Sequence, residues 1–279
     1  MKSDLYKHLI QEHRDSDGFI YHKECDSLLF SSLLGCLPDF HVNIDAAFDG
    51  TLWHRRSLQH PKCFVCGEEG NGSASSISRD MLVGLAWYCW HNQRGDIAEH
   101  VVEYALRNQG FMGEANEFKV KWGRTQILPG LLATFAIIAH KLTDRNYWWA
   151  YMIPADMGSQ IDDYGAHLQV LHIILRRQLV GWNWWFEKSI LKWQAKRRPE
   201  NPLYRIAVGD FSQVLAILGK EEWWPSDRLP TSRDRKTHSI QMREPKDWKP
   251  DPRKTIHTHC GDDYLFCEWL IEEEIKRRK

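Results

Sequence analysis

The sequence has no excess of charge of either sign. It carries 37 basic and 37 acidic residues, so its formal net charge is zero. Proteins that bind nucleic acids normally carry a basic excess, because much of their affinity comes from contacts with phosphates. We therefore expect no nucleic-acid partner. The basic runs at 196–198 and 276–279 are short and are expected to end helices, where cations suit the negative pole of the helix dipole.

Long uncharged apolar runs are also missing. The first residues, MKSDLYKHLIQEH, have no apolar stretch of the kind that a secretory signal peptide needs. No window of about 18 residues is apolar enough for a transmembrane helix. We expect synthesis in the cytoplasm and no membrane partner, and the sequence leaves the final location open.

Familiar catalytic signatures are absent as well. The sequence has no glycine-rich phosphate loop, no G-x-S-x-G elbow and no H-E-x-x-H zinc motif. Its seven cysteines are odd in number and several lie in apolar helical patterns, which favours reduced thiols over a disulfide framework. We expect no cofactor.

One cysteine pair has the spacing of a metal site. His54, His60, Cys63 and Cys66 form H-x5-H-x2-C-x2-C, in which two thiolates on a tight turn supply two corners of a zinc tetrahedron. A second Cys-x2-Cys does not follow downstream. A reduced pair in a loop is therefore preferred, with a structural zinc as the alternative.

The most distinct helix in the sequence spans Ser75 to Gly95. Ser78 is expected to cap its start, and Arg79 and Asp80 stand in the first turn, where an acid suits the positive end of the helix. The apolar residues that follow occupy more than one face, as in a buried helix. This stretch therefore predicts an inner helix with a charged Arg-Asp pair at its N-terminus.

The rest of the chain is also mainly helical in pattern, and we expect a single all-α domain over 1–279. Further helices are predicted at 4–13, 25–37, 97–108, 131–142, 162–180, 184–196, 203–218 and from 262 onward. Weak alternation at 111–125 indicates a small hairpin or an irregular excursion. Residues 54–76 form a long loop, and 221–256 an extended proline-rich arm or a mobile flap. A bundle and a ring of helical hairpins both fit this order.

Acids recur at the starts of the predicted helices, at Asp26, Asp80, Asp162-Asp163 and Asp262-Asp263. Ordinary N-capping explains each acid by itself. Alternatively, inner helices of a ring point their N-termini into one shared cleft, where mutual repulsion keeps one carboxyl protonated while another stays ionised. In that cleft the acids would converge with further side chains, namely Arg79, His22, His257 and His259.

The segments SISRDMLVGLAWYCWH and CDSLLFSSLL, together with the tryptophan-rich loops, carry a family resemblance. Over about residues 21–269 the chain resembles the α/α-toroid carbohydrate-active enzymes, which are rings of helical hairpins. The resemblance implies a cleft at the N-termini of the inner helices, lined with aromatic and acidic side chains. The chain is short for six hairpins, so we expect a toroid or an incomplete barrel with long irregular loops.

These features predict an enzyme that cleaves glycosidic bonds of a poly- or oligosaccharide. In a hydrolase, Asp80 with Asp26 or Asp262 would form the acid–base pair, and Arg79 would orient the substrate. A carboxyl separation of about 6.5–9.5 Å would indicate inversion and about 5–5.5 Å retention. In a lyase, Tyr164 or a histidine would abstract a proton, and Arg79 would stabilise the resulting charge.

Tryptophan is abundant, with 14 residues. Loop tryptophans can stack on sugar rings, whereas Trp87, Trp90, Trp184, Trp185, Trp193 and Trp269 are expected to pack between helices. The expected substrate-binding residues are His22, Trp53, Trp148, Asp163, Tyr164, His257 and His259. The rival hypothesis is a non-catalytic α-helical structural or binding protein, whose tryptophans serve interfaces.

Overall fold

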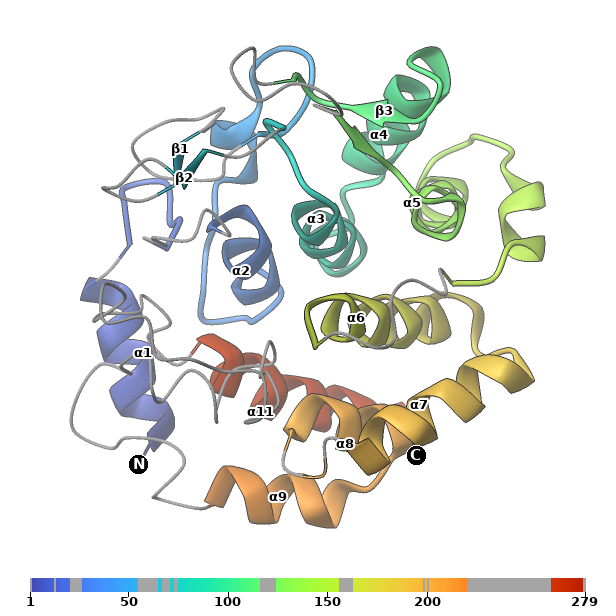
Figure 1. The fold of residues 1–279 in the computed structure, drawn as a ribbon. Helices are drawn as coiled ribbons and strands as arrows, with labels where there is room; N and C mark the ends of the chain where they lie inside the picture. Colours follow the sequence, from blue (N-terminus) through green and yellow to red (C-terminus); the bar gives the residue numbers. More distant parts are fainter. Residues whose placement is uncertain are drawn as a thin grey trace. The chain divides into compact units, whose positions relative to one another are not determined.

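The computed structural model in Figure 1 is mostly helical, which confirms the all-α prediction at that level. Its contacts divide the chain into two compact units, Arg14–Asp156 (unit 2) and Met1–His13 with Met157–Lys279 (unit 1). A closed toroid and a single domain stay predictions. The structure describes residues 2–12, 14–20, 27–54, 65–66, 71–72, 75–115, 124–155, 163–197, 199, 201–219 and 262–277.

Among its described residues, unit 2 contains four helices, two short 3₁₀ segments and two small antiparallel hairpins. The helices are α2 (Ser27–Leu34), α3 (Arg79–His91), α4 (Gly95–Arg107) and α5 (Pro129–Leu142), and the 3₁₀ segments are η1 (Ile44–Ala47) and η3 (Trp148–Met152). Strands β1 (Val65–Cys66) and β2 (Asn71–Gly72) pair with each other, as do β3 (Phe111–Met112) and β4 (Thr125–Gln126). The second pair favours the hairpin over the irregular excursion, the two alternatives predicted for 111–125, and residues 116–123 between its strands lie outside the described residues.

The helices of unit 2 form an inner and an outer set. Every residue of α2 is buried, as are residues 80–89 of α3 and 133–139 of α5, because these segments are apolar around most of their circumference. Helices α2, α3 and α5 lie side by side in unit 2 (Figure 1). In contrast, α4 buries one stripe, which includes Ile97, Val101 and Ala105, and it packs on α3 and α5. The prediction of a buried α3 is therefore confirmed.

Helices α2 and α3 approach each other closely at Gly84. A Cβ atom at this position would lie 2.7 Å from the Leu29 carbonyl oxygen and 2.8 Å from the Leu29 Cα atom. Both distances are well inside ordinary van der Waals contact, so only glycine fits here without moving a backbone.

The boundary between α3 and α4 differs from the prediction. Gly95, expected to end the central helix, is the first residue of α4, and α3 already ends at His91 with Asn92 as its C-cap. The connection is only residues 92–94, and Gln93 adopts a positive φ of 56° within it. The tight corner is possible because Gly95 packs against Leu142, where a Cβ atom would lie 2.6 Å from the Leu142 Cβ.

Unit 1 contains α1 (Lys2–Glu12), α6 (Asp163–Val180), α7 (Trp185–Arg197), α8 (Pro202–Val208), α9 (Phe211–Gly219) and α11 (Asp262–Lys276). The single helix expected at 203–218 is wrong, because the chain breaks at Gly209, which ends α8 in the left-handed conformation (φ 79°). Glycine adopts this conformation without the Cβ penalty of other residues. Helices α1 and α11 pack together, with the Tyr6 and Tyr264 ring centroids 5.2 Å apart.

Candidate functional site

The start of α3 carries the predicted Arg-Asp pair. Ser78 occupies the N-cap position with extended backbone, but its side chain accepts no backbone N–H, which corrects the capping prediction. Its hydroxyl instead donates to the Asp80 carboxylate. Asp80 is only 1% exposed, whereas Arg79 next to it is exposed. The acid is therefore enclosed at the positive end of a buried helix, where the helix dipole favours negative charge.

The segment before α3 is held by the β3–β4 hairpin. The Ser76 amide donates to the Glu114 carbonyl at 3.0 Å, and the Glu114 amide donates to Ser76 Oγ at 2.8 Å. From the other strand, Thr125 Oγ1 donates to the Ile77 carbonyl at 2.6 Å. Gly113, with φ 67°, leaves space for this contact, since a Cβ atom there would lie 2.5 Å from Ser76 Oγ. The hairpin thus positions the residues that lead into Asp80.

The other predicted acids and bases are only partly described. Asp163 and Asp262 begin α6 and α11, as the sequence indicated, and Tyr164 lies in the first turn of α6. Both helices belong to unit 1, whereas Asp80 belongs to unit 2, so the convergence of the acids on one cleft stays a prediction. Asp26, His22, His257 and His259 lie outside the described residues.

The two predicted tryptophan ligands have opposite surroundings. Trp148, in η3, is 65% exposed and presents an open aromatic surface. Trp53 is only 4% exposed, so the expectation that it offers a free face to a sugar is wrong. Its ring packs 4.6 Å from the Phe48 ring and 5.4 Å from the His100 ring. A turn organised by Asp49, whose carboxylate accepts from the Leu52 amide, brings Phe48 and Trp53 together.

Only two of the four predicted zinc ligands lie among the described residues. The His54 ring is buried, with Nε2 3.1 Å from Asp49 Oδ2, and Cys66 lies in β1. His60 and Cys63 lie outside the described residues. Over the described ranges, no three His, Cys, Asp or Glu side chains form a group able to hold a metal ion. The zinc site therefore stays a prediction.

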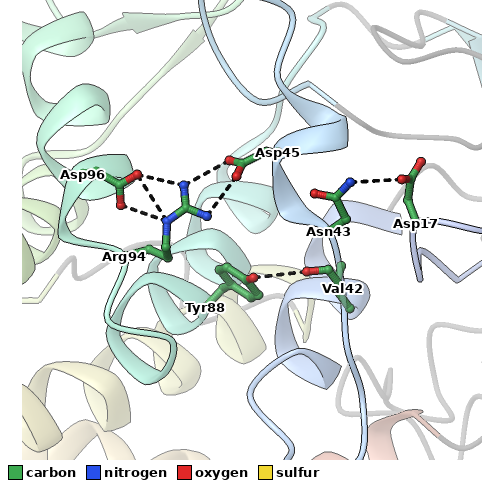
Figure 2. A network of polar contacts seen from close by, with 7 residues as sticks. All are labelled: Asp17, Val42, Asn43, Asp45, Tyr88, Arg94 and Asp96. Atoms are coloured by element: carbon green, nitrogen blue, oxygen red, sulfur yellow. Dashed lines mark hydrogen bonds and ion pairs between the residues drawn. The ribbon is translucent and has the colours of Figure 1, made fainter.

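Sequence reasoning missed a polar network at the corner between α3 and α4 (Figure 2). The Arg94 guanidinium donates to Asp45 at 3.0 and 3.1 Å and to Asp96 at 2.8 and 2.9 Å. The hydrogen bond from Arg94 is the main reason that the pKa of Asp96 lies below its usual value. Nearby, the Tyr88 hydroxyl donates to the Val42 carbonyl at 3.1 Å. The network attaches η1 to the helical core, a structural role that explains these charges without a ligand.

An exposed aromatic cluster lies in unit 1, at the connection from α6 to α7. It comprises Trp182, Trp184, Trp185 and Phe186, with neighbouring ring centroids between 5.0 and 5.9 Å apart. Trp185 is 76% exposed, so the expectation that it packs between helices is wrong; Trp193 is also exposed.

Local capping explains why the Trp185 ring is exposed. Gly181, with φ 82°, ends α6, and Glu187 turns back to accept from the Trp184 amide at 2.9 Å. The Asn183 side chain donates to the same Glu187 oxygen at 3.0 Å. This is the glutamate half of a capping box, and it fixes the register of α7 with Glu187 buried and Trp185 outside. The signal was available in the sequence N-W-W-F-E, which places a glutamate three residues after the N-cap.

Comparisons with known proteins add no identification. The sequence matches no protein-family model, no curated protein and no solved structure. Within the part of the chain that the structure describes, no helix is both long and apolar enough to cross a membrane. What the fold itself defines is a mostly helical protein with a buried acid at the start of an inner helix and tryptophan rings on its surface.

Proposed function

We propose that the chain is a carbohydrate-active enzyme that cleaves glycosidic bonds by carboxylate acid–base catalysis, on an α/α toroid or incomplete barrel. The observation that carries the proposal is Asp80, a carboxyl enclosed at the N-terminus of a helix that is buried along its length. The inner and outer helices of unit 2 support it, because a ring of helical hairpins places its inner helices in the same way.

The chemistry requires a proton donor held out of water. One carboxyl group of the catalytic pair must keep its proton near neutral pH as the general acid, while the other stays ionised. In the proposal Asp80 and a second carboxyl group, Asp26 or Asp262, form this pair of acid and base or nucleophile at the glycosidic bond. Arg79, exposed beside Asp80, orients the substrate.

The test compares two acids that stand at the same position of consecutive helices. Asp80 and Asp96 are the second residues of α3 and α4, but Asp96 is a surface residue paired with Arg94. We expect the wild-type protein to release reducing ends from at least one polysaccharide of a broad panel. Asp80→Asn should lower that rate at least about 100-fold, the usual contribution of an acid–base group, with an unchanged circular dichroism spectrum.

Asp96→Asn is the matched control and should keep nearly full activity. Full activity in Asp80→Asn, or no product from any polysaccharide with the wild-type protein, would overturn the proposal.

The second candidate is a non-catalytic binding or structural protein. It is favoured by the aromatic cluster at Trp182–Phe186, since exposed tryptophans are enriched at binding surfaces. Binding without any release of product in the same panel would support this candidate.

A further inference from the structure

The exposed face of α7 combines aromatic rings with positive charge. Along the helix the exposed side chains include Trp185, Lys188, Lys192, Trp193, Lys196 and Arg197. The opposite face, which includes Ile190, Leu191 and Ala195, is buried in unit 1. The aromatic residues therefore do not belong to the core, and their position on the surface needs a separate explanation.

All four exposed charges of α7 are positive. The single acid of the helix, Glu187, is 1% exposed and accepts from the Asn183 side chain and the Trp184 amide. This local excess stands out because the whole chain has a net charge of zero. Within the described ranges, no carboxylate forms an ion pair with Lys188, Lys192 or Lys196. The face is thus complementary to a negatively charged partner.

Rings and cations lie together in a broad stripe on the exposed side of the helix, in the order Trp185, Lys188, Lys192, Trp193, Lys196 and Arg197. Trp185 and Trp193 are about 12 Å apart along the axis at a rise of about 1.5 Å per residue, with Lys188 and Lys192 between them. The Arg197 guanidinium lies 4.9 Å from the centre of the Trp193 ring. A ligand that contacts both rings and the lysines between them must therefore be extended and must carry both flat apolar surfaces and negative charges.

We propose that the exposed face of α7 binds an anionic polysaccharide, one whose sugars carry carboxylate or sulfate groups. The C–H face of a sugar ring packs on the negative face of an indole, and lysine ammonium groups pair with the anionic substituents. The inference rests on the proposed function and names its substrate class. The stripe on α7 holds the polymer while cleavage takes place elsewhere.

Two other polyanionic partners fit the observations less well. A nucleic-acid binder needs a basic excess over a larger surface, and the chain as a whole has none. A helix that inserts into an anionic membrane separates its apolar face from its cationic face. On α7 the tryptophans and lysines share one face, so an extended sugar polymer is favoured.

The experiment measures binding of the full chain to four probes by isothermal titration calorimetry. The probes are polygalacturonate, neutral dextran, single-stranded oligothymidylate and vesicles containing phosphatidylserine. We expect binding to polygalacturonate that weakens as salt rises, because the attraction between lysine and carboxylate is screened. Trp185→Ala and Lys192→Ala should each weaken this binding about tenfold.

The controls are Phe111→Ala and Lys141→Ala, which change an exposed aromatic residue and an exposed lysine of unit 2. Both should bind polygalacturonate as the wild-type protein does. Unchanged binding in Trp185→Ala, or equal or tighter binding of dextran, oligothymidylate or vesicles, would overturn the inference.

Failure of this inference can be told apart from failure of the proposed function. Suppose that the protein cleaves a neutral glycan, that Asp80→Asn abolishes this cleavage, and that α7 does not bind polygalacturonate. This result refutes only the proposed substrate class. A protein that binds polygalacturonate through Trp185 but releases no product from it, or from any other polysaccharide, refutes the cleavage and keeps the binding face.

Discussion

Replacing Gly84 by alanine tests the close packing of α2 against α3. In an isolated helix this change is favourable by about 1 kcal/mol, because alanine loses less backbone entropy than glycine. In the protein the new methyl group would meet Leu29 backbone atoms at 2.7 and 2.8 Å. A flexible side chain can move away from such a contact, whereas the backbone of a buried helix cannot.

The expected magnitude follows from these two opposing effects. Relief of the clash requires α2 and α3 to separate, which weakens the dispersion contacts along their shared surface. Overpacking of this kind costs about 1–3 kcal/mol, and more where backbone must shift. After the gain in helix propensity, we expect Gly84→Ala to lower the free energy of unfolding by about 2 kcal/mol. The melting temperature should fall by about 4–8 °C.

The assay is chemical denaturation followed by circular dichroism, together with a thermal melt of the same samples. Gly219→Ala is the control, because it makes the same chemical change in a helix where no described atom lies within 4 Å of the added Cβ. It should leave stability unchanged or slightly raised. If Gly84→Ala is as stable as the wild-type protein, the two helices do not approach each other as closely as described.

Two further predictions concern polar groups on the surface and at a helix start. Asp96→Asn should lower stability at pH 7 by no more than about 1 kcal/mol, since the pair with Arg94 is exposed. The pKa of Asp96 is lower in the folded protein than in the unfolded chain. The stabilisation of the folded state by the Asp96–Arg94 pair is therefore fully present above the unfolded pKa of about 3.9 and is lost as pH falls through the folded pKa. The free energies of unfolding of the wild-type protein and of Asp96→Asn, measured by urea titration, should therefore become equal between pH 5 and pH 2. A difference that stays constant over this range would contradict the role of Arg94. Glu187→Ala should cost about 1–2 kcal/mol, because the Trp184 amide and the Asn183 side chain lose their acceptor; Glu187→Gln, which keeps an acceptor oxygen, should recover part of that loss in the same assay.

Local signals in the sequence were sufficient for most helices. Pro129 starts α5, Gly181 follows the end of α6, and the apolar run after Asp80 forms a buried helix, because each of these signals acts within one or two turns of the chain. The helix prediction failed where a single residue changes the direction of the backbone. Gly209 breaks the expected helix at 203–218 by adopting a left-handed conformation, which the apolar periodicity of this stretch does not reveal.

The candidate site was predictable only in part. The acid at the start of α3 and the exposed Trp148 were found from helix-start and loop patterns. The Ser78 hydroxyl donates to Asp80 and accepts no backbone N–H of the helix, a side-chain orientation that the sequence does not reveal. The hairpin that holds the start of α3 joins segments about 40–50 residues apart, and local pattern contains no information about such contacts.

The sequence by itself determined that the chain is mainly helical and which helices are apolar enough to be buried. These properties depend on residues within a few positions of each other, so they can be read from spacing and capping. Only the tertiary structure decided that the Trp53 ring is buried beside Phe48 and His100 while Trp185 faces solvent. The exposure of an aromatic side chain depends on what packs over it, and the residues that do so can lie far away in the chain.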